Sequence, residues 1–234
     1  MRIFYTILLL FSIAFSSFGQ RENTYLPSKR NFRIKYVSYD SKDRKQYSEV
    51  WQLVGKSKSD GLIQYNIESE ITTKKHSIFY QYFRLVSNDS IFFIGSERYM
   101  DPIKLDSYQR MVIKISSDSV AIPIKPKIGQ MLPESCCEAS ILRGTGSVLM
   151  SMTVLLVNRK VDAVETIKTP AGSFTCFKIS SEKLTFGGIS KSKTKLFEWY
   201  AVNVGLVRME ERHLKGKIIS YKVLESLAED FLLP

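Results

Sequence analysis

The chain has 234 residues, of which 44% are hydrophobic and 12% aromatic, a composition that can bury a core and excludes an intrinsically disordered chain. Its formal net charge is +11, but the basic residues are spread along the sequence and form no block. Such a charge could attract an anionic lipid, a glycan or nucleic acid, but we expect a solvated basic surface, because charge alone affects solubility and weak association. We expect no nucleic-acid partner, because the chain begins with an export signal and an exported protein rarely meets nucleic acid.

The first 19 residues have the features of a secretory signal peptide. Arg2 gives a positive start, and residues 3–15 are almost wholly apolar. This apolar run is shorter than the about 20 residues that a membrane-spanning helix needs, and no later segment is long enough either. With Ser17 and Gly19 at the −3 and −1 positions, the sequence predicts cleavage before Gln20. We expect no lipid anchor, because no cysteine lies near the cut.

Alternation of apolar and polar residues with a period of two recurs along the rest of the chain, which is typical of β-strands. It is clear in residues 30–40, 61–71 and 146–157, and turn-forming Gly, Pro, Asn and Asp residues separate such segments. Short connections require antiparallel neighbours, because parallel strands need a crossover of about a dozen residues or more. The pattern therefore predicts roughly ten or more short strands with no long amphipathic helix between them.

Some of these segments, such as residues 78–85, carry large apolar side chains on both faces. A sheet that curls on itself, or packs on another sheet, explains such a pattern. We predict an all-β fold, a single curled antiparallel sheet shaped as a half-barrel or β-roll, in one domain over residues 20–234. Residues 123–146 are rich in Pro and Gly and are expected to form a long irregular loop. Residues 224–233 are expected to form a short C-terminal helix.

The residue types that carry catalysis or bind metals are sparse and form no recognisable constellation. His76 and His213 stand alone in polar turns, without the partners of a catalytic triad or of a zinc site. Asp162, Glu165 and Glu198 are candidate cleft carboxylates, but nothing in the sequence distinguishes them from solvated strand residues. The sequence therefore assigns no catalytic residue, no metal and no cofactor.

The three cysteines gain a meaning from the predicted export into an oxidising compartment. Cys136 and Cys137 are adjacent in the irregular segment, whereas Cys176 lies in a predicted strand. Three cysteines allow one disulfide and leave one thiol over. A bridge from Cys176 to Cys136 or Cys137 would pin the loop to the sheet. Three free structural thiols, or a strained bond between the adjacent pair, are the alternatives.

Two predicted hairpins in the C-terminal half show the densest pattern. In the first, Pro170 presets φ and Gly172 takes the last position of a tight turn. In the second, Trp199 lies near the end of a strand and Gly205 lies in the turn that follows. We expect the Pro170–Gly172 turn to fix the strand register and Trp199 to be buried in the core.

These two hairpins resemble the TapB-like family of exported envelope proteins, a domain of unknown function. The family pattern is a Thr-Pro-Ala-Gly-x-Phe hairpin followed by a Trp-Tyr … Val-Gly-Leu-Val hairpin, which residues 169–174 and 199–207 match. The resemblance implies a curled antiparallel sheet, similar in outline to periplasmic lipoprotein carriers. It brings no catalytic residues with it.

The predicted function is that of a non-enzymatic protein of the periplasm, the outer envelope or the extracellular space. Its concave sheet is expected to bind a hydrophobic small molecule or lipid, with Tyr80, Tyr82, Phe92 and Phe93 as the candidate aromatic lining. A structural or interaction module of the envelope with a filled core is the alternative, and an envelope hydrolase comes third. An open pocket favours binding, whereas a filled interior favours the structural module.

Overall fold

The computed structural model describes residues 24–27, 31–108 and 110–229. The predicted signal peptide and the predicted cleavage before Gln20 lie outside these residues. Thirteen strands form one antiparallel sheet in the order β6-β8-β9-β10-β11-β12-β13-β1-β2-β3-β4-β5-β7. The strands are β1 (Phe32–Asp40), β2 (Lys45–Ser59), β3 (Leu62–Thr73), β4 (Ile78–Ser87), β5 (Ile91–Gly95), β6 (Val112–Ser117), β7 (Ser119–Pro123), β8 (Ser135–Leu142), β9 (Val148–Thr169), β10 (Gly172–Gly187), β11 (Ser190–Ala201), β12 (Gly205–Arg212) and β13 (Ile218–Glu229).

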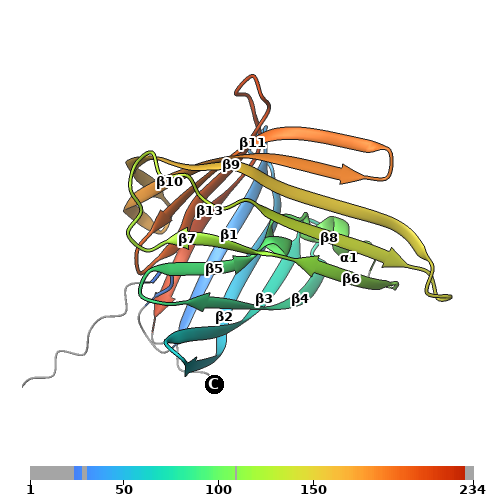
Figure 1. Ribbon diagram of the computed structural model, residues 1–234, viewed down its shortest axis with the longest axis horizontal. Coiled ribbons are helices and arrows are strands. Elements are labelled where there is room, and N and C mark those ends of the chain that lie inside the picture. The colour runs from blue at the N-terminus through green and yellow to red at the C-terminus, as the bar shows by residue number, and fades with distance from the viewer. Residues whose placement is uncertain (1–23, 28–30, 109, 230–234) are drawn as a thin grey trace, which may run out of the picture.

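The sheet curls until its two ends meet, as the ribbon shows (Figure 1). The terminal strands β6 and β7 follow one another in the chain, with Asp118 alone between them. The backbone N–H of Asp118 donates to the carbonyl of Cys136 at 2.9 Å, and the Asp118 carbonyl accepts from the backbone of Ser96 at 2.9 Å. The predicted single curled antiparallel sheet is therefore confirmed, in a nearly closed, barrel-like form with one seam.

A short helical segment lies at the seam of the sheet. It is next to β4 and β6, which are not paired with each other. It consists of a 3₁₀ turn, η1 (Ser96–Tyr99), and one helical turn, α1 (Pro102–Asp106). β4 pairs with β5 over only three positions, 85–87, so residues 78–84 have no strand partner on that edge within the described part of the chain. Arg98 of η1 donates from Nη1 to Gln81 Oε1 of β4 at 2.8 Å. The segment thus holds Arg98 and Tyr99 at the edge of the enclosed interior.

The predicted irregular loop at 123–146 is wrong in its second half, because β8 occupies residues 135–142. The alternation is present there, with Cys137, Ala139 and Ile141 fully buried. Small Ser, Cys and Ala side chains conceal it in the sequence, since they carry little of the apolar signal that marks a strand.

The predicted C-terminal helix is also wrong over residues 224–229, because β13 extends to Glu229, and the rest of that prediction lies outside the described residues. The pairing of β1 with β13 steps from Ser226 to Leu224 at a bulge, which leaves Glu225 as an extra residue. A bulge inserts one residue and shifts the side-chain alternation. Leu224 and Leu227 therefore stand three positions apart, a spacing that resembles one face of a helix.

Most of the core fills the inside of the curled sheet, where inward side chains such as Ile34, Ile67 and Leu85 are buried. A second, smaller cluster comprises Cys176, Trp199, Ala201 and Val207. Successive residues of a strand point to opposite faces, so Trp199 lies on the face opposite to its neighbours Glu198 and Tyr200. The second cluster buries apolar side chains on the opposite face of β10–β12, whereas on β4 the apolar side chains of that face, Ile78, Tyr80 and Tyr82, are exposed.

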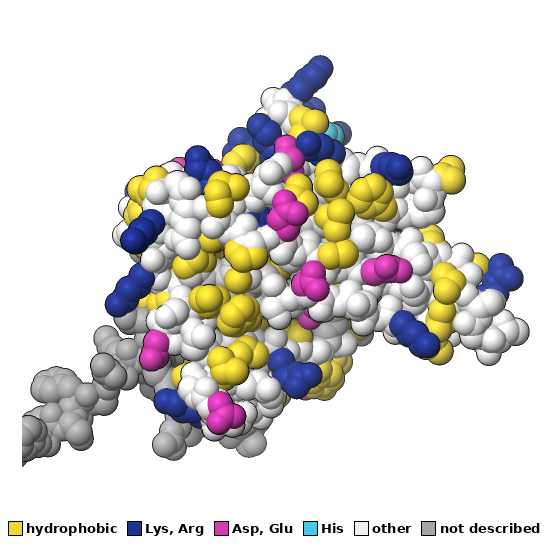
Figure 2. All heavy atoms as spheres, in the orientation of Figure 1, with side chains coloured by type: hydrophobic (Ala, Val, Ile, Leu, Met, Phe, Trp, Pro, Cys, Tyr) yellow, Lys and Arg dark blue, Asp and Glu magenta, His cyan; other side chains and the backbone are white. Residues whose placement is uncertain are grey.

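Charge is dispersed over the surface. Figure 2 shows Lys and Arg side chains scattered over one face of the molecule, with hydrophobic side chains between them. On this face the basic residues form no single block, in line with a solvated basic surface.

Both motif hairpins have the turns that their residues predict. Pro170 and Ala171 connect β9 to β10, and Gly172, with φ of 136°, pairs with Thr169. Gly205 begins β12 with φ of 110° and pairs with Ala201. Positive φ values of this size favour glycine, because other residues place Cβ against the backbone.

Gly205→Ala is expected to lower the free energy of unfolding by about 1–3 kcal/mol. A Cβ at position 205 would lie 2.8 Å from the carbonyl oxygen of Tyr25, which is backbone and cannot rotate away. Gly216→Ala is the matched control, because Gly216 has φ of 91° but no described heavy atom within 4 Å of the place that a Cβ would take. Urea titrations should place Gly205→Ala below Gly216→Ala, and equal midpoints would show that the Tyr25 contact is unimportant.

Candidate functional site

A buried carboxylate, Glu49 of β2, forms the polar centre of the interior. It is fully buried, and Lys222 Nζ of β13 lies 2.7 Å from its Oε2. Its Oε1 accepts from Arg98 Nη2, from Trp51 Nε1 at 2.6 Å and from Ser69 Oγ at 2.9 Å. One carboxylate therefore faces two cations. The cluster of Glu49, Arg98 and Lys222 carries one positive charge in excess.

These ion pairs decide the ionisation of Glu49. Burial alone would raise the pKa of Glu49, but Arg98, Lys222 and the hydrogen bond from Trp51 hold it well below its usual value. Burial lowers the pKa of Lys222, whereas the neighbouring Glu49 carboxylate more than offsets this and raises it. Glu49 and Lys222 are therefore both charged at neutral pH.

Acid should destabilise the protein through Glu49. A carboxyl whose folded pKa lies below its unfolded pKa of about 4.3 stabilises the fold above that pH, and the contribution is lost as pH falls below it. We expect the free energy of unfolding to fall from about pH 5 toward pH 2. The fall should be shallower in Glu49→Gln, measured by urea titration at each pH. Identical slopes in the two proteins would contradict the assignment of Glu49 as an ionised, paired group.

A cavity of about 390 Å³ opens beside this cluster, between α1 and strands β1, β2 and β10–β13. Its volume lies in the range of small-molecule sites. Four cations and two acids line it: Lys74, Arg98, Lys183, Lys222, Asp101 and Glu211. Lys183 pairs with Glu211 at 3.0 Å, and Lys74 donates to Gln46 at 3.4 Å. We call this space the outer cavity.

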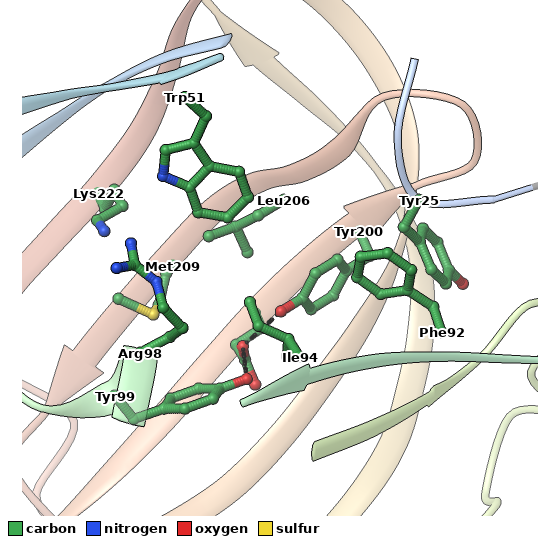
Figure 3. A pocket seen from close by; sticks show the side chains of 11 residues that line it. Tyr25, Trp51, Phe92, Ile94, Arg98, Tyr99, Tyr200, Leu206, Met209 and Lys222 are labelled. Atoms are coloured by element: carbon green, nitrogen blue, oxygen red, sulfur yellow. Dashed lines mark hydrogen bonds between the residues drawn. The ribbon is translucent and has the colours of Figure 1, made fainter. Parts of the chain in front are cut away.

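A smaller, mainly apolar pocket of about 30 Å³ lies deeper inside the sheet (Figure 3). Its apolar walls come from Trp51, Phe92, Ile94, Leu206 and Met209. Arg98, Tyr99, Met209 and Lys222 line both this inner pocket and the outer cavity, so the two spaces are neighbours. The inner pocket has room for one small group and not for an acyl chain, since a single water takes up about 30 Å³ of liquid.

Glu198 of β11 is the acid of the inner pocket, and only 1% of it is exposed. Its Oε1 accepts from the hydroxyl of Tyr99 at 2.8 Å and from that of Tyr200 at 2.9 Å, shown as dashed lines in Figure 3. Burial raises the pKa of Glu198, and the positive charges of Arg159 and Lys183 partly counter the effect. The sequence does not distinguish Glu198 from Asp162 and Glu165, whereas the structure shows that Glu198 is buried and Asp162 only partly buried.

The four predicted aromatic lining residues do not share a surface. Phe92 is buried and lines the inner pocket. Tyr80 and Tyr82 are 53% and 70% exposed, and their hydroxyls donate to Glu70 and Glu68 of β3. Phe93 pairs with Val86 and points to the face opposite to Phe92. A ligand contact at these residues stays a prediction, and of the four only Phe92 borders the inner pocket or the outer cavity.

The predicted bridge from Cys176 to Cys136 or Cys137 does not form, and all three thiols are free. Cys176 pairs with Glu165 of β9, whereas Cys137 pairs with Val154 of the same strand. Eleven positions along a strand correspond to about 35 Å, far beyond the about 7 Å between Cα atoms that a disulfide tolerates. Cys137 belongs to the main core cluster and Cys176 to the second cluster, so the two thiols lie in separate parts of the core.

Sequence reasoning missed Glu49, Arg98 and Lys222. A signal for Glu49 exists, because it has the same parity as Trp51 in β2 and therefore faces inward with it. Arg98 lies in a 3₁₀ turn without alternation, and only the closure of the sheet brings it to β2 and β13.

The described part of the chain was compared with the requirements of a membrane-spanning helix and of a metal site. No helix there is long and apolar enough to cross a membrane. No group of three or more His, Cys, Asp or Glu side chains there is arranged to hold a metal ion.

This chain is similar to one family model and to two solved bacterial proteins. A family model described as DUF3108-like matches residues 31–224. A protein named as exported, with a YmcC-like fold, from Bacteroides fragilis NCTC 9343 is 18% identical and has a TM-score of 0.76, covering 88% of this chain and 100% of its own. A protein named as a lipoprotein from Parabacteroides distasonis ATCC 8503 is 20% identical with a TM-score of 0.76, covering 88% of this chain and 99% of its own. No curated protein matches the chain. The specific resemblance to the TapB-like family stays a prediction.

Proposed function

This chain belongs to the DUF3108-like family, and from its sequence and its interior cavity we propose that it is an exported, non-enzymatic envelope protein that binds a small anionic molecule. The proposal of export rests on the signal-peptide pattern of the first 19 residues and on the names of the two structural neighbours, one exported and one a lipoprotein. The proposal of a ligand rests on the outer cavity.

The lining of the outer cavity carries the argument for an anion. Its four cations outnumber its two acids, and Arg98 and Lys222 must also neutralise Glu49. One positive charge therefore remains over in a partly enclosed space of about 390 Å³. An excess of one sign of charge in a partly enclosed cleft raises the local concentration of the opposite ion.

The same geometry moves the proposed ligand away from a lipid. A hydrophobic ligand needs an apolar space of a few hundred Å³. Of the two neighbouring spaces lined by described residues, the apolar one is the inner pocket of about 30 Å³, and the larger outer cavity is mixed and cationic. An envelope structural module stays the second candidate, because packed side chains fill most of the interior.

Calorimetric titration with propyl phosphate tests the proposed function. We expect saturable binding that weakens as salt is added, because salt screens exposed charges. Lys183→Gln removes a cation of the outer cavity and should weaken binding about tenfold, whereas Lys215→Gln, at an exposed hairpin tip, should leave it unchanged. No saturable binding, or equal binding by both variants, would contradict the proposal. Saturable binding of a fluorescent fatty acid instead would favour the lipid-like ligand.

A further inference from the structure

One carboxylate oxygen of Glu198 stands out within the inner pocket. Among the described residues, no group makes a hydrogen bond to Glu198 Oε2, although the side chain is 1% exposed. Leaving a buried polar atom without a partner costs free energy, so such an atom calls for an explanation. The pocket that Glu198 lines is large enough for one small polar group.

The other oxygen is already committed. Tyr99 and Tyr200 both donate to Oε1, at 2.8 Å and 2.9 Å, which fixes the carboxyl group and leaves Oε2 for an additional partner. Tyr99 belongs to η1 at the seam and Tyr200 to β11, so two separate elements hold the group in place. A carboxyl oriented in this way is suited to recognition, since its neighbours prevent it from turning away.

The surrounding charge selects the partner. Arg98 and Lys222 line the same pocket, and the positive charges of Arg159 and Lys183 act on Glu198. These cations would repel an ammonium group. A hydroxyl is neutral, and it can donate to an ionised carboxylate or accept from a protonated one.

We propose that the inner pocket is a subsite for a hydroxyl group of the bound anion, and that Glu198 makes the hydrogen bond that selects it. The inference rests on the proposed function, because the anionic part of the ligand lies in the outer cavity. Arg98, Tyr99, Met209 and Lys222 line both spaces, so one molecule can reach from one to the other. The ligand class is therefore a small hydroxylated anion.

Two series of probes test the inference on the whole mature protein: alkyl phosphates of two to about six carbons, and the same molecules with a terminal hydroxyl. We expect a preference of about tenfold for the hydroxylated probe at one chain length, the size of one hydrogen bond. In Glu198→Met the hydroxylated and the plain probe should bind about equally. It should survive in Glu198→Gln, whose amide can still bond a hydroxyl and whose oxygen can still accept from Tyr99 and Tyr200.

The carbon-13 shift of the Glu198 carboxyl gives a second reading that needs no variant. It should move on addition of the preferred hydroxylated phosphate and stay in place with its alkyl counterpart. Phosphate binding without a hydroxyl preference at any length, or a preference that persists in Glu198→Met, would overturn the inference and leave the proposed function standing. Failure of every probe to bind would overturn both.

Discussion

Replacing Glu49 with Gln is expected to lower the free energy of unfolding by about 3–5 kcal/mol. The side chain is fully buried and bonded to Arg98 and Lys222, themselves about one-tenth exposed. Loss of its charge leaves two cations in the interior with no carboxylate to face, and breaking a buried pair from one side costs more than the pair contributes.

Urea titration at pH 7 measures this effect. Glu134→Gln serves as the control, because Glu134 is exposed and should change stability by less than about 0.5 kcal/mol. The double variant Glu49→Gln, Lys222→Met should lose less than the sum of the two single losses, since each single change leaves the other partner unpaired. A Glu49→Gln protein as stable as its parent would show that Glu49 is not ionised in the fold.

Truncating Trp199 to Ala is expected to cost about 3–5 kcal/mol, although Trp199 lies outside the main core. The side chain is 5% exposed and packs with Cys176 and Val207 in the second cluster. Its Nε1 donates to Glu165 Oε2 at 2.8 Å, and Lys178 Nζ lies 5.2 Å from the ring centroid. The change removes a large buried surface and leaves the Glu165 oxygen without its donor.

Trp199→Phe separates these two contributions. It keeps most of the buried ring but removes the indole N–H, so it should cost about 1–1.5 kcal/mol. Denaturant midpoints that place Trp199→Ala level with the parent would mean that this face of the sheet does not contribute to stability.

The fold class follows from the sequence because alternation and turn chemistry are local signals. The turn at Pro170 and Gly172 is readable in this way, and the structure has it. Two errors have local causes as well: the small residues of β8 carry a weak apolar signal, and the bulge at Glu225 gives β13 the spacing of a helix. The closure of the sheet at Asp118 is not readable, because it depends on contacts between residues far apart in the chain.

The candidate site was largely beyond prediction for the same reason. Glu49 and Lys222 are 173 positions apart, and only the pairing of β13 with β1 and of β1 with β2 brings them together. Glu198 could be named as a candidate carboxylate, but its burial and its two tyrosine partners depend on the curl of the sheet. A pattern of residue types identifies which side faces inward, whereas the site depends on which inward residues meet.

Native mass spectrometry of the mature protein, isolated from its own envelope, tests whether the outer cavity holds a small anion. We predict a bound small anion in the parent, lost or strongly reduced in Lys183→Gln and retained in Lys215→Gln, since of these two lysines only Lys183 lines the outer cavity. An acylated lipid bound equally to all three proteins, or a parent with no bound molecule that also fails to take up added propyl phosphate, would contradict it.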